Sequence, residues 1–177
     1  YSENSTVYEK KNDHEIFGTL LLKSELPLKK ELENSTNFLK PILQLRVSPT
    51  NGKNISSSDT RIEFDNLFSP NRIGRSDMVE KGSSLSLGIE FEKQVEKENL
   101  INEKILGFSL GNVLKYKKND SLPLKSKLSE TRSDFVGNFY YKIEDMIELN
   151  YNFSYDRDLD FSNYDAITAK FGSNNFI

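Results

Sequence analysis

The chain has 177 residues, enough for one domain, and its 24 Lys and Arg stand against 27 Asp and Glu. The net charge of −3 argues against a nucleic-acid binder, whose affinity depends on a basic surface. The absence of cysteine excludes disulfides and thiolate metal sites within these residues. No run of about 18 apolar residues exists to form a membrane-spanning helix. The mean hydropathy of −0.61 is nevertheless compatible with a membrane β-barrel, whose strands are half polar.

Strand-like stretches recur along the chain, separated by polar and charged connectors. Two Lys- and Glu-rich stretches, residues 26–34 and 95–103, lack a convincing apolar stripe, and we expect them to be loops or single turns. Roughly eight strands joined in this way predict an all-β protein, an antiparallel meander of hairpins. In chain order the strands are expected at residues 16–23, 41–48, 61–67, 83–92, 105–116, 135–141, 147–156 and 166–171.

Residues 147–156 form the clearest strand, an unbroken alternation of apolar and polar side chains. The stretch is longer than the usual ~5–6 residues of a strand and matches the ~9–11 residues that cross a membrane at a tilt. Its apolar face therefore meets either a protein core or lipid. That face carries Ile147, Leu149, Tyr151, Phe153 and Tyr155, and the polar face carries Glu148, Asn150, Asn152, Ser154 and Asp156.

The connectors alternate in length in the second half of the chain. Residues 142–146 allow a short hairpin turn, whereas residues 117–133 form a long hydrophilic connector. Short turns alternating with long loops are typical of outer-membrane barrels. Residues 93–104 also look long, which departs from this rule.

Two short motifs resemble functional sites without meeting their requirements, so we expect neither catalysis nor a metal or cofactor site. Gly107-Phe-Ser-Leu-Gly111 matches the nucleophile elbow of hydrolases, but the one histidine, His14, precedes the serine, and Ser109 lies inside an alternating strand. Residues 156–167 open like a calcium loop. That loop requires a glycine and a glutamate where this chain has Phe161 and Ile167.

The most specific block is residues 65–77, Asp-Asn-Leu-Phe-Ser-Pro-Asn-Arg-Ile-Gly-Arg-Ser-Asp, which continues through Glu80-Lys-Gly82 to Leu85-Ser-Leu-Gly88. It resembles the LptD family, the lipopolysaccharide-assembly barrel also called organic solvent tolerance protein. Residues 38–49, 107–111 and 151–160 are also similar to strands of this barrel. The residues that carry the family motif are Leu67, Phe68, Asn71, Arg72, Gly74 and Asp77 entering a strand, followed by Gly82 and Gly88.

The resemblance implies a part of a larger outer-membrane protein. The chain begins at Tyr1 without a leader and stops at Ile177 without a closing turn, which also leads us to expect a piece of something longer. Residues 38–177 would be a partial transmembrane barrel, and residues 1–37 an N-terminal strand and polar connector. Family members receive lipopolysaccharide from periplasmic bridge proteins through an N-terminal domain and insert it into the outer leaflet. An LptE-like lipoprotein plugs the barrel.

The resemblance also gives the strand faces their expected environments. The apolar set Ile147, Leu149, Tyr151, Phe153 and Tyr155 would face outer-membrane lipid, with Tyr140, Tyr151 and Tyr155 as candidates for an aromatic girdle. Small and polar side chains would leave room in the lumen for the lipopolysaccharide head group. These expected lumen-facing residues are Gly107, Ser109, Gly111, Glu148, Asn150, Asn152 and Ser154.

Two alternatives remain open at this point. The chain would fit another outer-membrane barrel, such as a porin or receptor, if the match of residues 67–88 were fortuitous. It would also fit a soluble β-sandwich or adhesin-like binding module, in which the apolar faces pack on each other.

Overall fold

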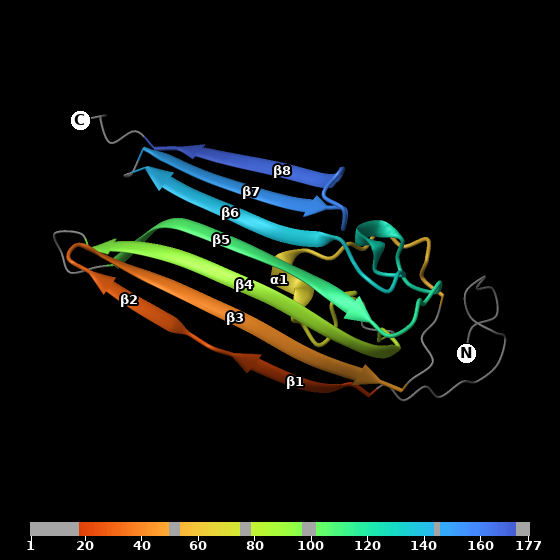
Figure 1. Ribbon diagram of the computed structural model, residues 1–177. Coiled ribbons are helices and arrows are strands. Elements are labelled where there is room, and N and C mark those ends of the chain that lie inside the picture. The colour runs from red at the N-terminus through yellow and green to blue at the C-terminus, as the bar shows by residue number, and fades with distance from the viewer. Residues whose placement is uncertain (1–17, 50–53, 75–78, 97–101, 144–145, 173–177) are drawn as a thin grey trace, which may run out of the picture.

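The computed structural model describes residues 18–49, 54–74, 79–96, 102–143 and 146–172, which are almost entirely strands and their connections (Figure 1). Two short helical turns interrupt the connections, α1 (Phe64–Leu67) and the 3-10 turn η1 (Lys125–Lys127). The strands are β1 (Leu20–Glu25), β2 (Leu28–Leu32), β3 (Ser35–Ser48), β4 (Gly82–Glu96), β5 (Asn102–Lys115), β6 (Phe135–Ile143), β7 (Ile147–Tyr155) and β8 (Ser162–Phe171).

All eight strands belong to one sheet in the order β1-β3-β4-β5-β6-β7-β8, with β2 also paired to β3. Every pairing is antiparallel, and each strand from β3 to β8 lies beside the next strand in sequence. The predicted all-β antiparallel meander is therefore confirmed. The two edges of the sheet are β8 on one side and the β1–β2 pair on the other.

Strands β1 and β2 occupy successive halves of the same edge of β3. Glu25 is paired with Ile42, and pairing resumes at Leu28, opposite Leu39. The break falls at Leu26 and Pro27, where proline lacks the N–H that a ladder requires. The expectation of a loop or single turn at residues 26–34 is thus wrong for β2. Backbone pairing with β3 needs no apolar stripe, and the side chains of β2 are all exposed.

The strand expected at residues 61–67 is also wrong, because this stretch contains α1. Ile62 and Phe64 do alternate with polar residues, but no strand pairs with them, and Leu67 is buried three residues after Phe64. The amide N–H of Glu63 donates to Asn66 Oδ1 at 3.0 Å and caps the helical turn. One helical turn places residues three apart on the same side, which directs both apolar side chains into the core.

The long connections lie at one end of the sheet and the short turns at the other. Residues 49–81 and 116–134 make the long connections at one end, where residues 156–161 also lie. The turns at the other end are short (Figure 1). Residues 93–104 had been expected as a long connector, but β4 runs to Glu96 and β5 begins at Asn102. The connection between β4 and β5 is therefore short, and it fits the alternation of short turns and long loops that is typical of outer-membrane barrels.

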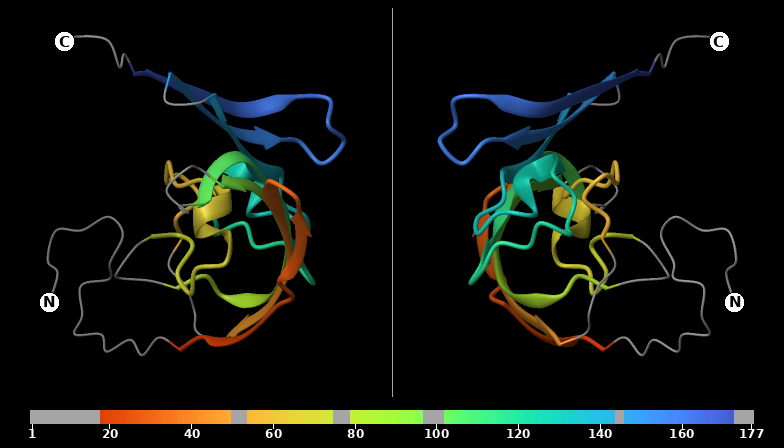
Figure 2. Two further views of the ribbon diagram at one scale, coloured as in Figure 1. Left: turned by 90° about the vertical axis from the view of Figure 1, so that its left-hand side faces the viewer. Right: turned by 90° about the vertical axis from the view of Figure 1, so that its right-hand side faces the viewer.

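The sheet is curled, and the first long connection lies inside the curl. Figure 2, viewed along the strands, shows β1 to β5 curving around α1 and its flanking loops, while β7 and β8 extend away from them. We call residues 54–74 the inserted segment. The core lies between this segment, the second long connection and the concave face of the sheet. Its residues are Ile42, Ile55, Ile62, Phe64, Leu67, Ile73, Val113, Leu122, Leu128 and Val136.

Candidate functional site

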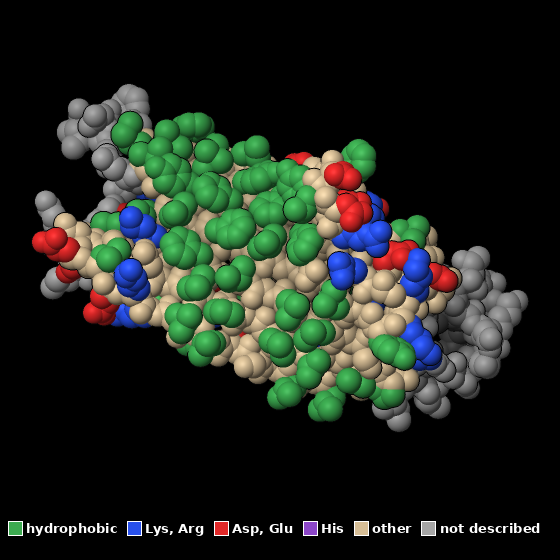
Figure 3. All heavy atoms as spheres, in the orientation of Figure 1, with side chains coloured by type: hydrophobic (Ala, Val, Ile, Leu, Met, Phe, Trp, Pro, Cys, Tyr) green, Lys and Arg blue, Asp and Glu red, His purple; other side chains and the backbone are tan. Residues whose placement is uncertain are grey.

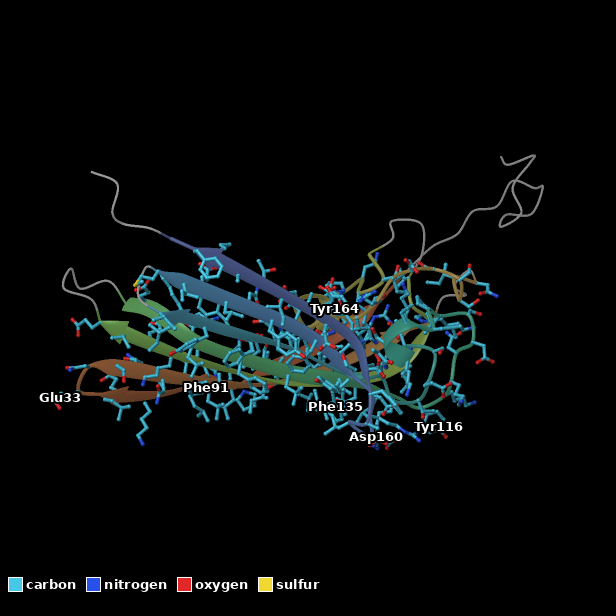
Figure 4. The ribbon with its side chains drawn as sticks, turned by 90° about the horizontal axis from the view of Figure 1, so that it is seen from above. Glu33, Phe91, Tyr116, Phe135, Asp160 and Tyr164 are labelled. Atoms are coloured by element: carbon cyan, nitrogen blue, oxygen red, sulfur yellow. The ribbon has the colours of Figure 1, made fainter. Side chains whose placement is uncertain are left out.

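The convex face of the sheet is apolar and exposed. Figure 3 shows apolar side chains covering this face, with charged side chains gathered toward its two ends. Phe91 and Phe135 point to this side in Figure 4, whereas Tyr164 points toward the inserted segment. Apolar residues exposed on a surface of this extent mark contact with a partner or a membrane. The large exposed ones include Leu43, Leu45, Val47, Leu87, Phe108, Phe139, Tyr141 and Ile143.

The apolar side chains of β7 all lie on this convex face. Tyr151 is paired with Phe139 on one side and Ile167 on the other, and Leu149 is paired with Tyr141. The rings of Tyr151, Phe153 and Tyr155 form a row with centroids 5.4 and 5.6 Å apart. The face predicted for Ile147, Leu149, Tyr151, Phe153 and Tyr155 is therefore a continuous apolar surface, and its contact with lipid stays a prediction.

The residues expected to face the lumen share the concave face. Gly107, Ser109 and Gly111 of β5 stand opposite Tyr140, Asn138 and Val136 of β6. The same three residues of β6 stand opposite Asn150, Asn152 and Ser154 of β7, and Glu148 follows in the same alternation. Whether this face lines a lumen also stays a prediction. Tyr140 belongs to this face, so its expected place in a lipid-side girdle with Tyr151 is wrong.

Asparagine side chains bond to one another across the concave face. The amide of Asn138 donates to Asn152 Oδ1 at 2.6 Å and also to Asn150 Oδ1. These groups are half-buried and keep further donors and acceptors for a polar ligand. Tyr140 lies beside them, with its ring centroid 5.3 Å from Lys104 Nζ. The arrangement can hydrogen-bond neutral polar groups.

A cavity of about 440 Å³ opens on the concave side between the strands and α1. Four of its charged side chains are paired across strands, Lys40 with Glu90 at 2.5 Å and Lys104 with Glu92 at 3.3 Å. Ser109 and Asn138 also line it. The cavity thus joins the asparagine cluster to a band of ion pairs.

The family-motif stretch precedes β4, which begins at Gly82, and several of its residues hold the inserted segment against the concave face. A Cβ at Gly88 would lie 2.6 Å from Phe68 Cζ, and a Cβ at Gly111 would collide with Leu67 Cδ2. These two glycines therefore make room for α1, and the space in front of them is filled. Among the other motif glycines, Gly74 and Gly82 adopt φ of +72° and +108°, which favour glycine.

Arg72 is the motif residue with the most polar contacts. Its guanidinium pairs with Glu80 through Nε–Oε2 at 2.5 Å and Nη2–Oε1 at 3.0 Å. It also donates to Ser84 Oγ at 2.6 Å and Ser86 Oγ at 2.9 Å, both on β4. Both members of the ion pair are buried. Asn71 lies next to Arg72 in the inserted segment, and its carbonyl accepts from the amide of Gly74 at 3.1 Å. Asp77 lies outside the described residues.

Two more cations converge on the same carboxylate. Lys115 Nζ lies 2.9 Å from Glu80 Oε1, and Arg46 Nη1 donates to the Glu80 carbonyl at 2.6 Å. Burial alone would raise the pKa of Glu80, but the charges of Arg72 and Lys115 outweigh burial and lower that pKa to about 2. The sequence pattern did not predict this cluster. One feature of the sequence could have indicated it. Arg46 lies on the same face of its strand as Ile42 and Gln44, which places a charged side chain on the inward face.

The two motifs set aside in the sequence lie in β5 and at the long-loop end. Ser109 lies in the middle of β5, which confirms its strand context. Asp156 pairs with Lys127 at 2.6 Å at the long-loop end. The residues that the structure describes contain no group of three or more potential metal ligands. Within the same residues, no helix is long and apolar enough to cross a membrane.

Comparison with known proteins gives one result for the whole chain. The family model described as "LptD: LPS transport system D" matches residues 2–177. No curated protein matches the chain. Between the LptD barrel, another outer-membrane barrel and a soluble sandwich, the match favours the first. The chain belongs to the LptD family of outer-membrane β-barrel proteins, which acts in lipopolysaccharide transport.

Proposed function

We propose that this chain forms part of the wall of the outer-membrane translocon that inserts lipopolysaccharide into the outer leaflet. The observation that carries the proposal is the opposite chemistry of the two faces of one sheet. The convex face is a continuous apolar surface, and the concave face carries asparagines, serines and paired charges. A transmembrane barrel requires this division, with apolar side chains toward lipid and polar ones toward the lumen.

The concave face suits a phosphorylated sugar head group. The asparagine cluster offers amide donors and carbonyl acceptors for hydroxyls, and the cavity beside it carries Lys40 and Lys104, which are paired with Glu90 and Glu92. Charge-assisted hydrogen bonds from such lysines favour phosphate. The inserted segment fills the concave side of β4 and β5, so we place the lipopolysaccharide path along β5 to β8. This path includes Ser109, Asn150 and Asn152.

The sorting of the connections supports an orientation in the membrane. Outer-membrane barrels keep short turns at the periplasmic side and long loops at the cell surface. Residues 49–81 and 116–134 would therefore lie at the outer side, and the short turns would face the periplasm. Lipopolysaccharide would enter from periplasmic bridge proteins at the short-turn end. An LptE-like lipoprotein would occupy part of the concave side that this chain leaves uncovered.

Completion of the barrel requires further strands. Strands β1 and β2 form one edge and β8 the other, and exposed edges are not tolerated in hydrocarbon because each backbone group must be paired there. We infer that the parent protein supplies strands that pair with both edges. The apolar convex face then meets lipid around a closed wall.

Site-specific photocrosslinking in the intact parent protein tests the proposal. A photoreactive residue replacing Asn152 on the concave face should capture lipopolysaccharide during transport. The matched position is the adjacent Phe153, which points to the convex face and should capture much less. A second measurement is depletion of the parent protein, which should reduce surface lipopolysaccharide and weaken the permeability barrier. Equal capture at the two positions, or a normal outer leaflet after depletion, would contradict the proposal.

A further inference from the structure

Four charged side chains are buried together at the long-loop end of the concave side. Arg46, Arg72 and Lys115 contribute three positive charges, and Glu80 contributes one negative charge. Their side chains are between 0 and 5% exposed. Among the described residues, no other carboxylate pairs with any of these three cations. The cluster therefore holds two positive charges in excess, in a place that water does not reach freely.

Two side-chain donors at this cluster lack a partner in the described part of the chain. They are Nη2 of Arg46 and Nε2 of Gln44. Both side chains are buried, with 1% of each residue exposed, and they are neighbours on the concave face of β3. The other guanidinium nitrogens of Arg46 already donate to backbone carbonyls of Glu80 and Pro70. Buried donors in folded proteins are nearly always paired, so these two call for an acceptor.

The acceptor must accept hydrogen bonds from both donors and must also compensate the excess positive charge. A water molecule would accept from Arg46 and Gln44, but it would leave the two excess positive charges uncompensated in a low-dielectric interior. An anion satisfies the donors and compensates the charge together. The hydroxyls of Ser84 and Ser86, which accept from Arg72, line the adjacent position of β4 opposite Arg46 and Gln44.

We propose that the cluster binds a small anion of the chloride or phosphate class, held by Arg46 Nη2 and Gln44 Nε2. The bound anion stabilises the inserted segment against the wall, because Arg46 lies on β3 while Arg72 belongs to the inserted segment and Lys115 to β5. Because a ligand that binds only the folded state stabilises it by an amount that rises with the ligand concentration, the site makes barrel stability depend on anion concentration. This inference does not depend on the proposed transport of lipopolysaccharide.

The first test uses the full-length parent protein in detergent. Its Tm is measured in sodium chloride and in sodium phosphate from micromolar to 100 millimolar, at an ionic strength held constant with sodium gluconate, whose anion is large. We expect a rise in Tm with chloride or with phosphate relative to gluconate, which continues with the logarithm of the anion concentration once the site is filled. A Tm that is the same in all three salts would overturn the proposal.

A second arm separates free anions from a lipid phosphate. The same protein, in gluconate, receives purified lipopolysaccharide or lipopolysaccharide from which the phosphates have been removed enzymatically. A rise in Tm with the phosphorylated form alone, absent in the Gln44→Glu variant, would identify the bound group as a head-group phosphate. Equal rises with the two forms would overturn a head-group phosphate as the bound anion.

The Gln44→Glu variant tests the position of the site. This change has nearly the same shape and supplies a carboxylate beside Arg46, so the variant should keep a high Tm and lose its dependence on chloride or phosphate. The matched control is Gln94→Glu at the far end of the same concave face, which should retain the dependence. Anion dependence that persists in Gln44→Glu at its original strength would overturn the assignment to this cluster.

Discussion

At the scale of single residues, glycines determine how closely other elements pack on the concave face. Gly111 was predicted to leave room in a lumen, and Gly88 was named as a family-motif residue, but the side chains of Leu67 and Phe68 occupy the space in front of them. A glycine in a strand often marks the close approach of another element, and here the element is α1. These glycines therefore serve the packing of the inserted segment.

The substitution Gly111→Ala should destabilise the full barrel by about 1–3 kcal/mol, because the new Cβ meets Leu67 and lies 2.7 Å from the Leu87 carbonyl oxygen. Denaturant unfolding in detergent measures the change. The control is Gly18→Ala, where a Cβ meets nothing within 4 Å and the free energy of unfolding should not change. Equal stability of the two variants would contradict this account of α1 packing.

The buried carboxylate of Glu80 should make the stability of the folded protein sensitive to acid. Its pKa falls from 4.5 to about 2 on folding, so the stabilisation that it provides is present above pH 4.5 and is lost as the pH falls from 4.5 toward 2. The substitution Glu80→Gln should lower the free energy of unfolding near pH 7 by a few kcal/mol, about 3–5, because it leaves three buried cations without a counter-charge.

The pH dependence of Tm checks this prediction. Wild-type Tm should drop between pH 4.5 and 2 by more than that of Glu80→Gln, which cannot lose a charge that it lacks. The control Glu130→Gln removes an exposed carboxylate paired with Lys118 and should follow the wild-type profile. Parallel profiles for wild type and Glu80→Gln would refute the role of Glu80.

At the scale of elements, the alternation in β7 shows how well a strand pattern predicts faces. Period-two alternation requires only an extended backbone, so the division between Leu149 and Asn150, or between Phe153 and Asn152, survives in the structure. The stretch at residues 61–67 also alternates in part, yet it forms α1 because no strand lies beside it. Alternation therefore predicts faces reliably only where neighbouring strands complete the ladder.

The orientation of β7 in the membrane is tested by Phe153→Arg. An arginine on a lipid-facing strand costs about 2–4 kcal/mol at the middle of the bilayer, so assembly of the full-length barrel should fall sharply. Asn152→Ala should reduce assembly only slightly, because the change removes only the 2.6 Å hydrogen bond from Asn138 and puts no charge into the membrane. Asn152→Arg adds a control with the same new side chain on the opposite face. Heat-modifiable mobility in gels measures assembly, and equal loss in Phe153→Arg and Asn152→Arg would refute the orientation.

At the scale of the whole molecule, the described strands form a sheet with two edges that none of them covers and with one apolar face. Neither feature suits an isolated protein in water, because unpaired edges and exposed apolar surface both favour aggregation. Residues 1–177 expressed alone should therefore fail to give a folded monomer without detergent. Far-UV circular dichroism and size-exclusion chromatography test this expectation. A folded, soluble monomer would instead support the β-sandwich interpretation, in which apolar faces pack on each other.

Local sequence patterns are enough to predict the all-β class, the antiparallel meander and the division of β7 and β5 into two faces. These follow from alternation and from turn composition, which act over a few residues. The likeness to the LptD family also rested on a local block, residues 65–88. Division of the chain at residue 38 stays a prediction, as do the lipid and lumen assignments of the faces.

Only the tertiary structure decided what the family motif does. Arg72 meets Glu80 eight residues on, but Arg46 and Lys115 come from other strands and converge on the same carboxylate only when the sheet curls around the inserted segment. Alternation can predict that a charged side chain lies on an inward face, but it does not predict which side chain it contacts there. The contact depends on burial by several elements at once, which a local pattern does not encode.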